Sequence, residues 1–374
     1  MMKVLFSTNL PSPYRVDFFN ELGKYCDLTV CYERETASDR DGKWTGKAAE
    51  SFKAVRLDLK PYKEDRSKGS ALRDYVKNND FDIVIFTNYV SPATMSAISY
   101  CRRHKKKYYI EYDGGFNKKD RFPISILKKY LICGADAHFT TCDEHEKYLL
   151  SLGISGEKIY KYPFTSVCEA DIKNADKLLE LDKGELRERL GIKEEKVVLS
   201  VGQFIHRKGF DVLIEAASKL DKDTGIYIVG GEPTEEYIEM QKARGLENLH
   251  FVGFKTKDEL GEYYAAANIF VLPTREDIWG LVVNEALSFG LPVVSTDRCI
   301  AALEMVKDGE NGYIVPVGDS DALAEKITVA LAQEEKKKPF FASSRETAQE
   351  YTIEKMATRH VEIFREIVGT CFEE

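Results

Sequence analysis

The segment REDIWGLVVNEALSFGLPVV, residues 275–294, decides the fold of the C-terminal half of the chain. It predicts a loop, one helix over residues 280–289, a stop at Gly290 and a buried strand that starts at Pro292. A helix followed at once by a strand rich in β-branched residues is typical of a parallel sheet covered by helices.

Glu285 is a carboxylate on what should be the buried face of this helix. Leu281 and Val282 lie on its inner side, and Phe289 follows one turn later. A buried carboxylate is expensive unless donors satisfy it, and a ribose diol offers two hydroxyl donors. Asp277 precedes Glu285 by eight residues, about 12 Å along a helical path. That spacing suits two parts of one extended ligand, although Asp277 is also explained as a charge favoured by the helix dipole.

Outward from this segment, apolar runs that predict buried strands alternate with amphipathic stretches that predict helices. The first series has predicted strands at residues 3–8, 27–32, 83–87, 108–112 and 137–141, and predicted helices at 14–24, 91–103 and 143–152. The second series has predicted strands at 196–201, 225–229, 249–252, 268–272, 292–295 and 312–315, and predicted helices at 210–220, 235–244, 257–266, 280–289 and 321–333. The pattern predicts an α/β protein with two doubly wound, Rossmann-like domains facing across a cleft, with ligands beyond the carboxyl ends of the strands.

A polar, helix-prone segment at residues 166–192 interrupts the pattern and predicts a connector. The expected domains are therefore residues 1–187 and 188–350, followed by a last amphipathic helix within 351–374.

Composition narrows the class of protein. The chain has 374 residues, 43% of them apolar and 31% charged, which is typical of a soluble two-domain protein. It has no apolar run long enough to span a bilayer, and its first strand is too short for the apolar core of a signal peptide. Eight Cys without CxxC pairs and six His without HxxxH spacing favour free thiols in a reducing cytoplasm and disfavour zinc.

The net charge of −8 disfavours nucleic acid as a partner. Residues 1–170 contain 28 basic and 23 acidic side chains, a net of +5, whereas residues 171–374 contain 26 and 39, a net of −13. Basic residues gather at residues 101–109, 117–121 and 128–129. These clusters are either solvated surface or a face for anionic lipid head groups or a phosphorylated acceptor.

The stretch SVGQFIHRKGFDVLIEA places two cations before a helix. A buried strand ends before Gly202, and Arg207 and Lys208 precede the helix that starts after Gly209. Cations oppose the dipole at a helix N-terminus, so local stability does not explain them. Unpaired N–H groups and two cations suit a phosphate or diphosphate, and the alternative is an exposed loop with ordinary surface charges.

Two other loops carry weaker signals. Gly230 and Gly231 end the strand YIV, where they allow a tight turn or a close ligand, but no GxGxxG fingerprint for a dinucleotide is present. The sequence GDSDAL contains a DxD pattern, yet Asp319 and Asp321 directly precede a helix and are better explained as its N-terminal cap.

On the N-terminal side, two loops follow predicted strands at the cleft edge. STNLPSPYR contributes Ser12, Tyr14 and Arg15 as candidate acceptor-binding residues, although it must also cap the next helix. EYDGGF places Asp113 after a strand, either as a catalytic cleft residue or as part of an Asp-Gly turn.

The motifs together resemble the glycosyltransferase family 4 (group 1) signature, an E-x7-E pattern within a GT-B fold. EDIWGLVVNEALSFGLPVV, VGQFIHRKGFDVLIEA, IVGGE, NLHFVGF, ELGEYYAAANIFVLPT and DGENGYIVP carry the resemblance over residues 198–327, and PSPYRVDFFNEL and YIEYDGGF match loosely. Two positions depart from the signature: its first acidic residue is Asp277, preceded by Glu276, and Gln203 replaces an arginine.

The resemblance implies a retaining transfer of a sugar from a UDP- or GDP-linked donor to a glycan or lipid-linked acceptor in cell-envelope polysaccharide synthesis. It implies that Glu285 binds the ribose and that Asp277 holds the donor sugar. The implied donor site further includes the backbone of Ile278, Trp279 and Gly280, the side chains of Leu281 and Val282, a base site near Phe254, and Gly202, Gly230 and Gly231 near the phosphates.

For the reaction itself, the resemblance implies that Lys208 and Arg207 stabilise the departing diphosphate without a metal cofactor. Asp113 takes the place of a family cleft residue, and the last helix packs back onto the N-terminal domain. The expected location is the cytoplasm, with peripheral contact at the inner face of an anionic membrane through that domain.

Two other functions stay open at this point. A GT-B nucleotide-sugar epimerase or hydrolase would share the nucleotide site, and a non-catalytic glycan-binding scaffold would share the fold.

Overall fold

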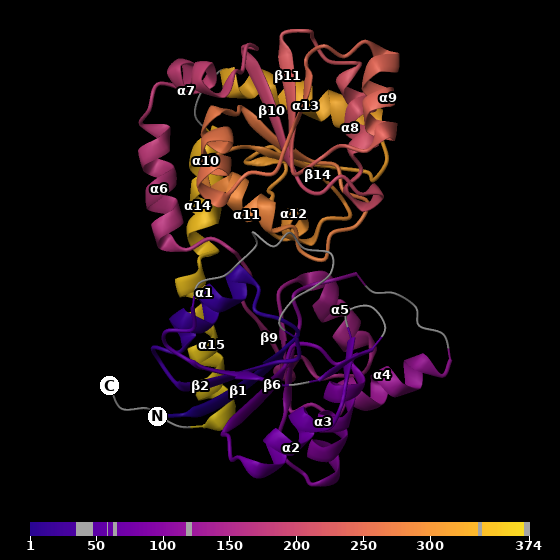
Figure 1. Cartoon of the computed structure of the whole chain (residues 1–374), viewed down its shortest axis with the longest axis vertical. Coiled ribbons are helices and arrows are strands. Elements are labelled where there is room, and N and C mark those ends of the chain that lie inside the picture. The colour runs from indigo at the N-terminus through magenta and orange to yellow at the C-terminus, as the bar shows by residue number, and fades with distance from the viewer. Residues whose placement is uncertain (35–47, 58, 63–65, 117–121, 336–338, 370–374) are drawn as a thin grey trace. The chain divides into compact units, whose positions relative to one another are not determined.

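A computed structural model describes residues 1–34, 48–57, 59–62, 66–116, 122–335 and 339–369. The chain divides into two compact units, Met1–Ser166 with Thr352–Glu374 and Val167–Tyr351 (Figure 1). The predicted basic cluster at residues 117–121 lies outside the described residues.

The first unit is built on a seven-stranded parallel sheet with the order β3-β2-β1-β6-β7-β8-β9. Its strands are β1 Lys3–Thr8, β2 Asp27–Tyr32, β3 Lys53–Arg56, β6 Ile83–Phe86, β7 Tyr109–Glu111, β8 Ala137–Thr140 and β9 Ile159–Lys161, with a separate antiparallel pair, β4 Lys60–Tyr62 and β5 Arg66–Lys68. Its helices are α1 Pro13–Leu22, α2 Ala71–Asn78, α3 Pro92–Arg103, α4 Ile124–Ile132, α5 Asp143–Ser151, the 3-10 turn η1 Gly156–Lys158 and α15 Ile353–Val368. The five predicted strands are confirmed to within about a residue at each end, whereas the short strands β3, β4, β5 and β9 were not predicted.

The second unit has a six-stranded parallel sheet with the order β12-β11-β10-β13-β14-β15. Its strands are β10 Lys196–Val201, β11 Thr224–Val229, β12 Leu249–Val252, β13 Ile269–Leu272, β14 Val293–Thr296 and β15 Gly312–Val315. Its helices are α6 Glu169–Leu179, α7 Lys183–Leu190, η2 His206–Lys208, α8 Phe210–Ala217, α9 Glu235–Arg244, α10 Lys257–Ala266, α11 Leu281–Ser288, α12 Ile300–Met305, α13 Ser320–Glu335 and α14 Pro339–Glu350. All six predicted strands are present.

Both sheets follow the doubly wound order, in which the chain reverses direction across the sheet after its first three strands. The reversal lies between β1 and β6 in the first unit and between β10 and β13 in the second. Loops that leave the carboxyl ends of such strands diverge and leave a crevice, where ligands bind in this class of fold. In the second unit, those loops contain Lys208 and Asp277.

The structure places the boundary between the units at residues 166 and 167, not at residue 187. Helices α6 and α7 pack on the second unit, and Arg187 accounts for much of the attachment. Its guanidinium donates to the carbonyl of Ala266 (3.0 Å), to the side chain of Asn268 (2.7 Å) and to the carbonyl of Glu195 (2.7 Å). The polar segment is therefore a covered layer of the domain and not a free connector.

Helix α15 completes the first unit from the other end of the chain. Its apolar stripe, including Met356, Ile363 and Phe364, is buried, and the helix packs along α1. The prediction of an amphipathic last helix is correct, and the structure gives its partner within this unit.

Candidate active site

The loops that follow β10 and β13 touch through their backbones. Gly209 has a φ of +69°, and a Cβ atom there would lie 2.1 Å from the carbonyl oxygen of Pro273. The amide of Arg275 donates to the carbonyl of Arg207 at 2.8 Å, and the hydroxyl of Thr274 donates to the same oxygen at 2.9 Å. Glycine is required here, and the contact brings η2 beside the acidic loop that precedes α11.

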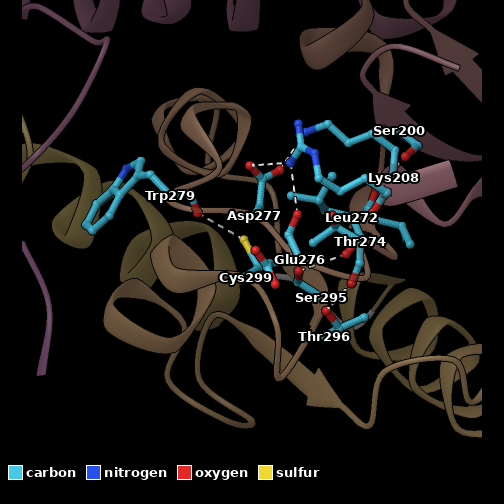
Figure 2. Close-up of polar contacts among 12 residues, drawn as sticks. Ser200, Lys208, Leu272, Thr274, Glu276, Asp277, Trp279, Ser295, Thr296 and Cys299 are labelled. Carbon is cyan, nitrogen blue, oxygen red and sulfur yellow. Dashed lines mark hydrogen bonds and ion pairs between the residues drawn. The ribbon is translucent and has the colours of Figure 1, made fainter. Parts of the chain in front are cut away.

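Asp277 accepts hydrogen bonds from both predicted cations (Figure 2). Lys208 Nζ lies 2.5 Å from Asp277 Oδ2, and Arg207 Nη1 lies 3.1 Å from Asp277 Oδ1. The side chains of Lys208 and Asp277 are each 12% exposed, whereas that of Arg207 is 44% exposed. Two cations on one carboxylate leave a net charge of +1 at the carboxyl edge of the sheet, which favours an anionic ligand.

The aliphatic part of the Lys208 side chain packs against Gly202. A Cβ atom at Gly202 would lie 3.3 Å from Cδ of Lys208, and one at Gly230 would lie 1.9 Å from the carbonyl oxygen of Gly202. The loops after β10 and β11 are therefore in direct backbone contact. Gly231 follows with a φ of +116°, and a Cβ atom there would meet no other atom within 4 Å, so this glycine borders open space.

Hydroxyl groups hold the end of β13 from both sides. Ser200 donates to the carbonyl of Val271 (2.6 Å), Ser295 to that of Leu272 (2.8 Å) and Thr296 to that of Thr274 (2.6 Å). All three hydroxyl side chains are buried. These bonds fix the strand end from which the loop carrying Asp277 departs.

The loop from Asp277 to Gly280 is tied to the segment that precedes α12. The amide of Asp277 donates to the carbonyl of Arg298 (2.8 Å), and the carbonyl of Trp279 accepts from the amide of Ala301 (2.8 Å). A Cβ atom at Gly280, where φ is +106°, would lie 2.7 Å from Sγ of Cys299. The backbone that enters α11 is thus fixed before any ligand binds.

Within this loop, the side chains of Ile278 and Trp279 differ in their exposure to solvent. Ile278 is 55% exposed, whereas Trp279 is buried and donates its indole N–H to Asn284 Oδ1 at 2.8 Å. The ring of Trp279 therefore packs in the core of the unit.

Glu285 lies half-buried on the side of α11 that lines a surface pocket. The hydroxyl of Tyr264 donates to Glu285 Oε2 at 3.0 Å, and burial, followed by the charge of Glu285, holds the pKa of Tyr264 well above its usual range. The core-facing residues of α11 are instead Val283, Ala286 and Leu287. Glu285 therefore lies beside an opening, at the edge of the buried face of α11.

The pocket beside Glu285 lies among α6, α10 and α11. Its lining includes Asp171, Leu178, Lys257, Leu260, Tyr264, Glu285 and Phe289. Lys257 Nζ pairs with Asp171 Oδ2 at 2.6 Å, so a cation stands near the carboxylate of Glu285. Sequence reasoning missed Tyr264, Lys257 and Asp171; each sits in an ordinary helical pattern, and their proximity depends on how three helices pack.

The other predicted donor-site residues are accessible to different degrees. Leu281 and Val282 are half-buried on the first turn of α11. Phe254, beyond the carboxyl end of β12, is 43% exposed, while Phe251 packs against Phe204 with ring centroids 5.5 Å apart. An exposed aromatic ring at a strand end suits stacking on a planar base.

In the first unit, Arg15 has a different role from the one predicted. Its side chain is 2% exposed, and its guanidinium pairs with Glu111 at 2.5 Å and with Asp113. Both terminal nitrogens of the guanidinium pair with internal carboxylates. We therefore correct the assignment of Arg15: it does not bind the acceptor but holds the side chain of Asp113 in place. The side chain of Asp113 is 37% exposed at the carboxyl end of β7.

The same buried network reaches α15 through His360. Its Nε2 lies 3.0 Å from Glu111 Oε2, and its Nδ1 lies 2.7 Å from the carbonyl oxygen of Met356. His360 therefore links the carboxylate of Glu111 to the backbone of α15. Burial alone would raise the pKa of Glu111, but Arg15 and His360 together lower it to about 2.

Ser12 and Tyr14 flank the start of α1. Ser12 is buried at the N-cap position, where its carbonyl accepts from the amide of Val16 at 2.9 Å. The half-buried ring of Tyr14 packs edge-on against Phe164 at 5.7 Å. The structure assigns Ser12 mainly to the helix start and leaves part of Tyr14 accessible.

Comparison with known proteins shows which family the second unit resembles. Residues 182–347 match the family model "Glycosyl transferases group 1". The chain is 28% identical over 292 residues to an uncharacterized glycosyltransferase of Haemophilus influenzae, with 76% of each chain covered. Residues 182–347 therefore match the group 1 glycosyltransferases, and most of the chain is similar to a glycosyltransferase. It is also 34% identical over 140 residues to the lipopolysaccharide core biosynthesis glycosyltransferase LpsE of Rhizobium meliloti, covering 36% of this chain and 39% of that one.

Solved structures confirm the fold of this glycosyltransferase as GT-B. Anabaena HepE, crystallised with UDP and glucose, superposes with a TM-score of 0.69 at 16% identity, covering 99% of this chain and 100% of that one. The family-model match and the glycosyltransferase relatives confirm the predicted enzyme class.

The DxD pattern of the glycosyltransferase is a helix cap. Oδ1 of Asp319 accepts from the amides of Asp321 (3.1 Å) and Ala322 (2.9 Å) at the start of α13. Over the part of the chain that the structure describes, no group of three or more His, Cys, Asp and Glu side chains could hold a metal ion. No helix among the same residues is long and apolar enough to cross a bilayer.

Proposed function

We propose that this glycosyltransferase moves a sugar, with retention of anomeric configuration, from a UDP- or GDP-linked donor to a glycan or lipid-linked acceptor in cell-envelope polysaccharide synthesis. The observation that carries the proposal is the meeting of Lys208, Arg207 and Asp277 at the start of α11, with Glu285 on the same helix beside a pocket. The relative from Rhizobium meliloti, named for lipopolysaccharide core synthesis, supports the class of product.

The donor binds along α11 in this proposal. Its diphosphate takes the hydrogen bonds of Lys208 and Arg207 that Asp277 now accepts, and Asp277 is then available to the hydroxyls of the donor sugar. The ribose hydroxyls donate to Glu285, which Tyr264 orients. In this proposal the eight residues between Asp277 and Glu285 keep the two carboxylates on separate parts of one extended ligand.

The transfer breaks the bond between the anomeric carbon and the diphosphate oxygen. A bond to the acceptor oxygen forms on the same face, and the acceptor proton passes to the departing phosphate oxygen. Lys208 and Arg207 stabilise the negative charge that develops on the diphosphate, which is work that preorganised cations do well where water is scarce. Asp113, held by Arg15, orients the acceptor hydroxyl.

We expect the enzyme to act in the cytoplasm, at the inner face of the membrane. Seven cysteines lie among the described residues, and all seven are free thiols. Free thiols suit a reducing compartment. The free energy of the transfer comes from the donor, so no cofactor is needed.

The test is incubation of the enzyme with UDP- and GDP-sugars and candidate glycan acceptors, followed by detection of free nucleotide. NMR of the product should show a glycoside with the anomeric configuration of the donor. An isomerised or merely hydrolysed sugar would indicate an epimerase or hydrolase instead. Absence of nucleotide release with any donor would indicate a glycan-binding scaffold.

A further inference from the structure

A chain of polar side chains runs through the apolar interior of the first unit. It starts on α15 at His360, passes through Glu111 at the end of β7 and Arg15 on α1, and ends at Asp113. His360 and Glu111 are fully buried and Arg15 is 2% exposed, whereas the side chain of Asp113 is 37% exposed. One end of the chain therefore lies inside the protein, and the other lies at the carboxyl edge of the sheet, where ligands bind in this class of fold.

The orientation of the His360 ring is fixed by its surroundings. Aromatic rings pack around it with centroids 4.6 to 6.4 Å away: Phe6, Phe18, Phe139, Tyr162 and Phe364. Its Nδ1 lies 2.7 Å from the carbonyl oxygen of Met356, and its Nε2 lies 3.0 Å from Glu111 Oε2. A leucine would fill such an apolar site without the cost of burying a polar ring, so packing alone does not explain a histidine here.

Glu111 divides its two oxygens between two partners. Oε2 faces His360, and Oε1 pairs with Arg15 Nη1 at 2.5 Å. An arginine and a carboxylate otherwise tend to pair through two parallel hydrogen bonds, which would take both terminal nitrogens of the guanidinium. Because His360 occupies Oε2, Arg15 contacts Glu111 through one nitrogen, and its Nη2 is left to pair with Asp113 Oδ1.

We propose that His360 is a positioning residue for the transfer reaction: by occupying one oxygen of Glu111, it directs Arg15 to Asp113 and so fixes the carboxylate that orients the acceptor hydroxyl. This inference rests on the proposed role of Asp113. Without His360, Arg15 turns to Glu111 with both nitrogens, and Asp113 loses its partner. The last helix of the chain therefore contributes to the reaction, although His360 acts through two other side chains.

Steady-state kinetics of the full chain test the proposal, with a nitrophenyl glycoside as acceptor and whichever UDP- or GDP-sugar the parent uses. His360→Leu should lower kcat by about 10- to 100-fold, the effect of a misplacement near the reacting atoms, and leave the KM for the donor unchanged. His360→Gln should restore most of kcat, because its amide nitrogen can donate to Glu111 Oε2 as the ring nitrogen of His360 can.

The pH dependence of kcat separates positioning from a general loss of stability. The charges that act on Asp113 are those of Arg15 and Glu111. Because Arg15 leaves Asp113 in His360→Leu, the pKa of that carboxyl rises, and the acidic limb of the profile should move to higher pH by about one unit. Phe364→Leu removes a buried ring from the same helix and is the matched control: it should lower the melting temperature and leave the acidic limb in place.

The deciding measurement is a double-mutant cycle with Asp113→Asn. Since His360 acts through Asp113, His360→Leu should lower kcat in the parent and have no further effect on kcat in Asp113→Asn. His360→Asn, which keeps a donor for the carbonyl of Met356 and is too short to reach Glu111, takes the place of His360→Leu in the cycle if that variant does not fold.

Three results would overturn the proposal: effects on kcat that add in the cycle, a folded His360→Leu that turns over like the parent, or an acidic limb that stays in place. A parent chain that releases no nucleotide contradicts the proposed function and this inference with it. Additive effects in an active enzyme contradict this inference alone.

Discussion

The replacement Glu285→Gln tests the ribose site most directly, because it keeps the shape of the side chain and removes its charge. In the structure, Glu285 Oε2 accepts from the hydroxyl of Tyr264 at 3.0 Å. Tyr264 is 2% exposed, so its hydroxyl needs that acceptor. The single carbonyl oxygen of glutamine must therefore turn toward Tyr264, and its amide nitrogen faces the pocket as a donor.

The magnitude follows from this geometry. A ribose hydroxyl that donated to the free carboxylate oxygen loses one charge-assisted hydrogen bond, worth about 1.5–3 kcal/mol. At about 1.4 kcal/mol per factor of ten, the affinity for a nucleoside diphosphate falls by roughly 10- to 150-fold. Tyr264→Phe keeps the charge and removes only the orienting bond, a net loss of about 0.5–1.5 kcal/mol, so its affinity should fall by no more than roughly tenfold.

Calorimetric titration with UDP or GDP, whichever the parent binds, and with the 2′,3′-dideoxy analogue measures the effect. The parent should discriminate strongly between the two ligands, whereas Glu285→Gln should lose most of that discrimination. Glu310→Gln, at an exposed position of the same unit, is the control and should behave as the parent does. If Glu285→Gln discriminates as strongly as the parent, or if the parent binds both ligands equally, Glu285 does not hold the ribose.

Three further predictions concern the rate, the metal and the pH. Lys208→Met should lower kcat by about 10²–10³-fold, the usual effect of removing one stabilising donor. Lys219→Met, which removes a lysine from an ion pair at the surface, is the control and should leave kcat unchanged. Equal steady-state rates for the two variants would refute the role of Lys208. Transfer should persist in EDTA, and a loss that Mg²⁺ or Mn²⁺ restores would contradict the assignment of Asp319 as a helix cap. The pKa of Glu111 falls from 4.5 to about 2 on folding, so its contribution to stability is present above pH 4.5 and disappears as the pH drops toward 2. Glu111→Gln should flatten that part of the acid-unfolding profile of the first unit, followed by circular dichroism, and an unchanged profile would show that Glu111 is not the titrating group.

Much of the second unit was predictable because its strands are apolar runs, and β10, β11 and β12 are directly followed by glycine. The sequence placed Lys208 just before a helix, Gly230 at the end of a strand and Asp277 in the loop between a strand and a helix, and the structure has them there. That the two cations meet Asp277 was not predictable, since it depends on β10 lying next to β13 and on the backbone contact between Gly209 and Pro273.

In the first unit, the sequence did not predict which buried polar residues contact each other. Glu111 within an apolar strand and His360 within an apolar helical stripe were visible signals, but nothing in the sequence joined them. Arg15 was predicted at the acceptor site because it follows a strand-end loop, whereas folding turns it inward to two carboxylates. Polar residues that satisfy each other over long sequence separations cannot be told from polar residues that await a ligand until the fold is known.

Helix α15 belongs to the unit that holds β1, although the whole of the second unit separates them along the chain. During synthesis, the ribosome therefore releases every strand of the first unit long before it releases His360, the partner of the buried Glu111. The second unit, a continuous stretch, can fold as soon as it emerges, while Glu111 in the first unit lacks its contact with His360 until α15 is made. The first unit, although its strands are made first, therefore completes its folding last. A chain truncated before α15 should keep a folded second unit and lack the last helix of the first unit.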